Sequence, residues 1–61
     1  MRIWIARDVN GDLALFLAKP RRRDDDWTCD LAFENAIWLD PDRFPNITWE
    51  NSPKEFVLNE D

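Results

Sequence analysis

The 61-residue sequence has no histidine and no tyrosine, and it contains one cysteine, one serine and one glycine. Histidine is the side chain that ordinarily titrates near neutral pH, and a serine or cysteine nucleophile needs such a base beside it. Cys29 and Ser52 have no histidine to activate them. The composition therefore predicts a protein without catalytic residues, which is not an enzyme.

Metal and cofactor sites also lack their usual ligands. One cysteine without histidine cannot supply a zinc site. Asp24, Asp25 and Asp26 are consecutive, whereas a calcium loop alternates its ligands and turns on a glycine. We therefore expect no metal and no other cofactor.

Long apolar runs are missing as well. The longest, residues 13–18, is far too short to cross a bilayer, and the N-terminal stretch carries a charge again at Arg7, unlike a signal peptide. A single cysteine cannot form an internal disulfide, which is typical of a reducing compartment. These features predict a location in the cytoplasm and no contact with a membrane.

What the sequence does have is apolar and aromatic area. Hydrophobic residues make up 44% of the chain, including four tryptophans and four phenylalanines. This content is typical of a folded chain, and the length allows one small domain, residues 1–61. At this size the core alone gives little net stability, so self-association or a partner would add to it.

Charge is divided between the two parts of the chain. Residues 1–23 carry six basic and two acidic side chains, a net of +4, and residues 24–61 carry two basic and eleven acidic ones, a net of −9. Most of these charges belong on a solvated surface. A sharper hypothesis is that the acidic part meets a basic surface, such as that of a nucleic-acid-binding protein.

Residues 2–7 and 13–18 are predicted to form an N-terminal β-hairpin. The first segment alternates Ile3 and Ile5 with Trp4, the second alternates leucines with Phe16, and Asn10-Gly11 between them favours a tight turn. Residues 19–26 are polar without periodicity, which predicts an exposed loop. Short strands are expected at 27–29 and 36–39, and a last strand at 54–59. Residues 30–35 fit a turn, a bulge or a continuing strand.

Asp40 followed by Pro41 is typical of a helix start, and Pro45 would end it after one 3₁₀ turn. The fold class expected from these segments is mostly β, a small antiparallel sheet of four to five short strands with one 3₁₀ or helical turn. The sheet either curls into a small barrel or covers its second face with loops or another copy of the chain.

The tryptophans and the arginine triplet allow more than one function. Trp4, Trp27, Trp38 and Trp49 fall on four segments, and we expect at least two of them in one aromatic core, with others available to a partner. If Ile3 and Ile5 face the core, Trp4 lies on a covered second layer or on a partner surface. Arginines 21–23 beside Trp27 would suit single-stranded nucleic acid, but the three aspartates that follow cancel their charge.

Three sequence blocks carry a resemblance to a known group. They are IWIARD with NGDL at residues 3–13, Lys19-Pro20 followed by Trp27, and FPNITWENSP at residues 44–53. Together they resemble short proteins encoded in bacteriophage and prophage genomes, while residues 24–39 depart from that pattern. The resemblance implies the cytoplasm of an infected bacterium, where small acidic phage proteins of the anti-CRISPR and anti-restriction kinds block host machinery.

The leading hypothesis is a non-enzymatic phage accessory protein that binds and inhibits a host protein, such as a defence complex, through an acidic and aromatic surface. The alternatives are a small self-associating module, such as a homodimer, and a single-stranded nucleic-acid binder. The candidate partner-binding residues are Trp4, Asp24, Asp25, Asp26, Trp27, Glu34, Trp38, Asp40 and Asp42.

Overall fold

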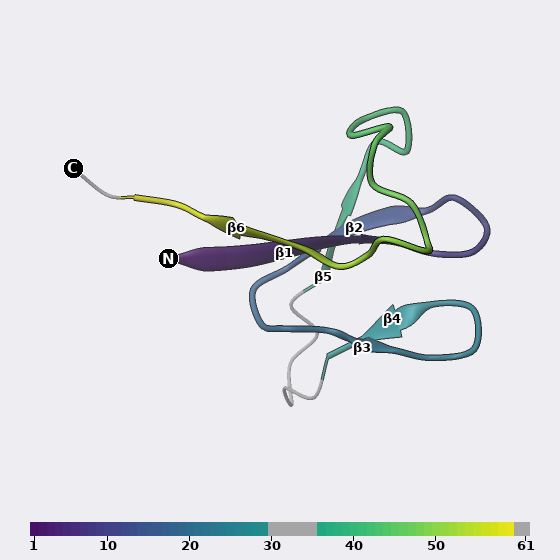
Figure 1. The fold of residues 1–61 in the computed structure, drawn as a ribbon, viewed down its shortest axis with the longest axis horizontal. Helices are drawn as coiled ribbons and strands as arrows, with labels where there is room; N and C mark the ends of the chain where they lie inside the picture. Colours follow the sequence, from purple (N-terminus) through teal and green to yellow (C-terminus); the bar gives the residue numbers. More distant parts are fainter. Residues whose placement is uncertain (30–35, 60–61) are drawn as a thin grey trace.

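The computed structural model describes residues 1–29 and 36–59, which form β-strands and loops without any helix. Four strands form one antiparallel sheet in the order β5-β2-β1-β6, and two short strands pair in a second sheet (Figure 1). The strands are β1 (Arg2–Arg7), β2 (Leu13–Phe16), β3 (Arg21–Arg22), β4 (Trp27–Thr28), β5 (Ala36–Leu39) and β6 (Lys54–Val57). The mostly β fold class expected from the sequence is confirmed.

The hairpin of β1 and β2 is the centre of the larger sheet. Trp4 pairs with Phe16 and Arg7 with Leu13, and the chain turns through Asn10 and Gly11. Gly11 has a φ of 98°, a conformation that glycine adopts without the steric cost of a side chain. The predicted hairpin is therefore confirmed, although β2 ends at Phe16 and not at residue 18.

β5 and β6 form the two edges, because β5 pairs only with β2 and β6 only with β1 within the described sheet. The strand predicted at 36–39 has the expected bounds, and the last strand ends two residues earlier than predicted, at Val57. With separate edges the sheet stays open among the described residues, so the barrel alternative is not observed. The sheet instead covers its faces with other parts of the chain.

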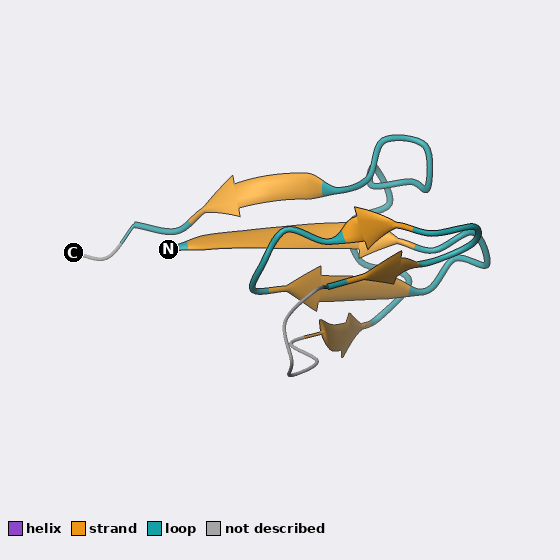
Figure 2. Cartoon of the chain, turned by 90° about the horizontal axis from the view of Figure 1, so that it is seen from below, coloured by secondary structure: helices purple, strands orange, loops and turns teal. Residues whose placement is uncertain are grey.

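One face of the sheet, the tryptophan face, carries Trp4, Ala6, Ala14, Phe16, Ala36 and Trp38. The β3-β4 pair covers it, as the view in Figure 2 shows, and buries Trp27 against Ala6, Ala14 and Phe16. Trp4 and Trp49 pack against the same cluster, so Trp4 lies in a covered layer and the predicted aromatic core is present.

The prediction of an exposed loop at 19–26 is wrong at Arg21 and Arg22, which form β3. Arg22 lies over the rings of Trp27 and Trp49, at 5.1 and 4.3 Å from their centroids, and donates a hydrogen bond to the Trp49 carbonyl. The cation–π contacts give this arginine a structural role that a solvated loop would not have.

The opposite face, the leucine face, carries Ile3, Ile5, Leu13, Leu15, Ile37 and Leu39. The loop between β5 and β6 crosses part of it and buries Ile47 against Ile5 and Leu13. The 3₁₀ turn expected at Asp40 is a hydrogen-bonded turn instead, from the Arg43 amide to the Asp40 carbonyl. It cannot continue as a helix because Phe44 takes a left-handed φ of 50°.

Arg7 connects this loop to the sheet. Its guanidinium donates five hydrogen bonds, of 2.6 to 3.1 Å, and all of them go to backbone carbonyls. The acceptors are Ile47, Gly11, Pro41, Arg43 and Phe44. Its own amide donates to the Ser52 hydroxyl, and its carbonyl accepts the indole N–H of Trp27. One residue thus fixes the covers of both faces.

We predict that Arg7→Lys destabilises the fold by about 3 kcal/mol, because two partly buried carbonyls lose a charged donor that one ammonium cannot replace in both places. A domain of this size has only about 3–9 kcal/mol in total, so the variant should lose at least about a third of its stability. Urea denaturation followed by tryptophan fluorescence measures the change. Arg2→Lys is the control, because Arg2 is exposed and its ion pair with Glu55 is long, at 3.8 Å. Equal losses of stability in the two variants would contradict the role of Arg7.

Candidate functional site

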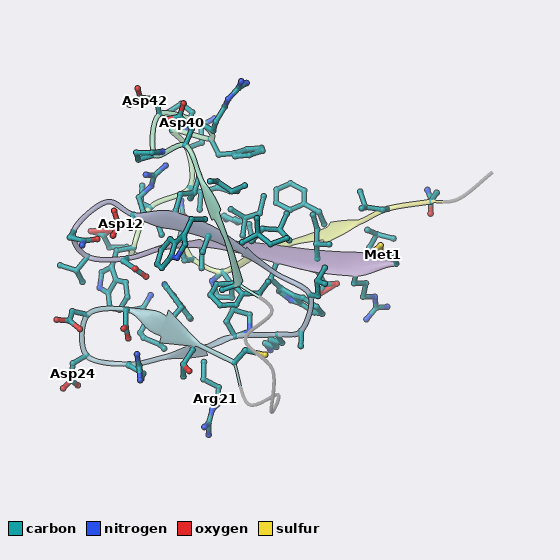
Figure 3. The ribbon with its side chains drawn as sticks, turned by 180° about the vertical axis from the view of Figure 1, so that it is seen from behind. Met1, Asp12, Arg21, Asp24, Asp40 and Asp42 are labelled. Carbon is teal, nitrogen blue, oxygen red and sulfur yellow. The ribbon has the colours of Figure 1, made fainter. Side chains whose placement is uncertain are left out.

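Three loops bring aspartates together at the end of the sheet farthest from Met1. Figure 3 shows Asp12, Asp24, Asp40 and Asp42 at that end, with Met1 at the other. A backbone hydrogen bond of 3.1 Å from Val9 to Asp25 joins the first two loops. We call this region the acidic end; its seven aspartates are Asp8, Asp12, Asp24, Asp25, Asp26, Asp40 and Asp42.

Local hydrogen bonds give these loops their shape. The Asp12 amide donates to the side-chain oxygen of Asn10, and the Asp42 amide donates to the carboxylate of Asp40, both at 3.0 Å. Such turns let short polar side chains satisfy the backbone outside a ladder. Asp40 therefore caps a turn, as the sequence indicated, although no helix follows it.

A cleft of about 160 Å³ opens at the acidic end, between the β3-β4 pair and β5. Its polar wall includes Asp8, Asp26 and Arg23, and its apolar wall includes Trp38. Trp38 is 66% exposed, more than any other large hydrophobic residue in the described chain. The cleft thus combines carboxylates with an accessible indole face.

The two carboxylates of the cleft differ electrostatically. Burial, together with repulsion from Asp26, Asp12 and Asp25, raises the pKa of Asp8. In contrast, the hydrogen-bonded ion pair with Arg23, with both N–O distances at 2.6 Å, lowers the pKa of Asp26. Of these two carboxylates, Asp8 is the one whose ionised form the fold disfavours, so a nearby cation would stabilise it.

The structure places the sequence-predicted residues in three different settings. Asp24, Asp25, Asp26, Asp40 and Asp42 all lie at the acidic end, and Trp38 borders its cleft. Trp27 is 9% exposed and Trp4 is half-buried, so both pack inside the molecule and the site is built without them. Glu34 lies outside the described residues.

Sequence reasoning missed Asp8 and Asp12, which flank the hairpin turn. Their position directly after β1 and before β2 was the available signal, since it puts both carboxylates at one end of the hairpin. Cys29, which borders the cleft, is half-buried and carries a free thiol.

The Ser52 hydroxyl is occupied by hydrogen bonds within the fold. The Ser52 hydroxyl accepts from the Arg7 amide and donates to the Thr48 carbonyl, so it links segments of the fold. Within residues 1–29 and 36–59, no three carboxylate or thiol side chains converge as a metal ion would require. The carboxylates and the indole around the cleft are suited to an organic cation, such as a lysine or arginine side chain.

Comparison with family models, with curated proteins and with solved structures finds no match for this chain. A search of the described residues for a helix long and apolar enough to cross a membrane finds none. The function is therefore argued from the geometry of the site.

We predict that Asp8→Asn makes the fold more stable at neutral pH. The raised pKa means that the folded chain binds the Asp8 proton more tightly than the unfolded chain, whose ordinary value is 3.8. Stability therefore falls as pH rises from 3.8 through the folded pKa, and the ionised carboxylate remains unfavourable above it. Thermal denaturation between pH 3 and 7 should show an advantage for the variant that disappears below pH 3.8. An equal advantage at every pH would contradict this electrostatic cause.

Proposed function

We propose that this protein is a non-catalytic binding module whose acidic end docks on a basic surface of a partner protein and blocks it. The observation that carries the proposal is the cleft in which Asp8 and Asp26 face the same space as the exposed ring of Trp38. An arginine or lysine side chain of the partner fits this combination of groups.

Two interactions would hold such a cation. Its charge pairs with carboxylates at the polar wall, and its flat or extended side chain lies against the indole of Trp38. Burial and, after it, neighbouring carboxylates raise the pKa of Asp8, so an incoming cation stabilises an ionised form that the free protein disfavours. Binding then has a favourable electrostatic term without any change in the fold.

The whole acidic end adds a longer-range field. Its seven aspartates outnumber three arginines of the same loops and strand end. Arg7 binds carbonyls, Arg23 pairs with Asp26, and Arg43 follows Asp42. The acidic end therefore keeps a net negative charge. Such a surface speeds association with a basic partner, while the indole contact slows dissociation.

The resemblance to phage-encoded proteins leads us to propose a host protein as the partner. A nucleic-acid-binding defence complex of the kind blocked by anti-CRISPR or anti-restriction proteins presents a basic groove, in which carboxylates would take the place of phosphates. The same proposal places the protein in the bacterial cytoplasm. The single-stranded nucleic-acid alternative has less support, because Arg22 is stacked on two tryptophans and Arg23 is paired with Asp26.

The binding mode is tested with a short arginine-rich peptide as a defined probe. Two-dimensional NMR separates the four indole N–H signals, and we expect the Trp38 signal to shift on titration while that of buried Trp27 stays in place. Trp38→Ala should weaken binding about 30-fold, since a desolvated cation–π contact is worth about 2 kcal/mol. Rising salt should weaken it further.

Matched charge variants separate the acidic end from net charge. Asp25→Asn removes one exposed charge at the acidic end, and Glu55→Gln removes one from β6. We expect weaker peptide binding only for Asp25→Asn. The proposal is wrong if both variants bind alike, or if a partner captured from a bacterial lysate binds wild type and Trp38→Ala equally and keeps its nucleic-acid affinity in the complex.

A further inference from the structure

The leucine face is only partly covered. The β5-β6 loop buries the half next to the acidic end, where Ile47 packs on Ile5 and Leu13. Outside that contact, Ile37 at the β5 edge is 53% exposed and Phe56 at the β6 edge is 37% exposed. Because sheets of this kind are stable when an apolar face is packed, the uncovered part is the unusual feature.

These exposed side chains form one patch across the sheet. Phe56 pairs with Ile3, and Ile37 pairs with Leu15, while Ile3 and Leu15 lie diagonally across β1 and β2. Phe44 extends the patch from the loop, with its ring centroid 6.4 Å from that of Phe56. We call these five residues the open patch: Ile3, Leu15, Ile37, Phe44 and Phe56.

Phe44 holds its place at a conformational cost. A non-glycine residue with a φ of 50° is strained, and the carbonyl of Phe44 is fixed by the Arg7 guanidinium and the Ile47 amide. Phe44 is nevertheless 45% exposed. The fold thus keeps an aromatic residue at the patch with nearly half of its surface accessible.

We propose that the open patch binds the open patch of a second copy, giving a two-fold dimer in which two sheets stack face to face. Aligned sheets pack in this way through apolar inner faces about 10 Å apart. The patch contains no charged residue, and Lys54 lies at its rim. A flat, uncharged and apolar surface is complementary to its own copy.

The distribution of charge determines how two copies can stack. A chain with a net charge of −5 repels its copy, most strongly at the acidic end. The strand residues of the patch leave out Leu13 and Leu39, the row nearest the acidic end, so antiparallel stacking brings the two patches together and points the two acidic ends in opposite directions. Phe44 is the residue of the covering loop that enters the contact.

The expected interface is small. A standard interface takes about 800 Å² from each partner, which is about one sixth of the 4612 Å² surface of this chain. A patch of five side chains with its rim belongs at or below that size, so we expect a dimer with a Kd of about 10–100 µM.

Sedimentation equilibrium over a wide concentration range tests the proposal with matched variants. Phe56→Lys and Ile37→Lys place a charge in the patch. The controls are Val57→Lys and Trp38→Lys. Each places the same charge at the next residue of the same strand, whose side chain lies on the tryptophan face. We expect the dimer Kd to rise at least about 100-fold for the first pair, because each dimer would bury two charges, and to stay within about threefold for the second.

The two patch variants lie on different strands, so the test remains valid if one of them fails to fold. Circular dichroism reports whether each variant is folded. Wild type that stays monomeric to about 1 mM overturns the proposal. So does a dimer that survives both patch variants. Loss of the dimer in Trp38→Lys, with Ile37→Lys unaffected, would assign the contact to the tryptophan face or the β5 edge instead. These outcomes are independent of peptide binding at the acidic end.

Discussion

The fold depends on one arginine whose donors are all used on the backbone. The guanidinium of Arg7 binds five carbonyls in the hairpin turn and the β5-β6 loop, while its amide and carbonyl bind Ser52 and Trp27. A chain of 61 residues has a small core, and both covers of its sheet are loops or two-residue strands with few ladder bonds of their own. Without the fixed guanidinium at the end of β1, the β5-β6 loop and the hairpin turn beside it would lose these five hydrogen bonds.

The choice of acceptors also shapes the electrostatics. Arg7 lies among aspartates, yet it binds carbonyl oxygens, so its positive charge organises the loops without forming ion pairs with their carboxylates. Of the carboxylates at the acidic end, Asp26 has a close ion pair among the described residues, with Arg23. The loops are therefore held together by hydrogen bonds and keep their negative charge. Repulsion from Asp26, Asp12 and Asp25 adds to the effect of burial in raising the pKa of Asp8.

The sequence predicted the elements whose signals are local. Asn10-Gly11 specified the hairpin, and the apolar run at 36–39 specified β5 with its bounds. It did not predict β3, because a two-residue strand has no periodicity and its position depends on the stacking of Arg22 on Trp27 and Trp49. The role of Arg7 was hidden because most of its acceptors lie 34 to 40 residues away and are backbone atoms. Likewise, the sequence showed aspartates in separate segments, and only the topology shows that they share one end.

The two proposed surfaces use different interactions and lie in different parts of the molecule. Both can therefore be occupied at the same time. Contacts at the acidic end are electrostatic and weaken with salt, whereas stacking at the open patch is apolar and insensitive to it. An antiparallel dimer through the patch would present two acidic ends facing outward. Two linked sites on one partner assembly bind more tightly than either alone, provided the spacing of the basic surfaces allows both to engage. A small module with a shallow cleft would gain occupancy by this geometry without a larger core.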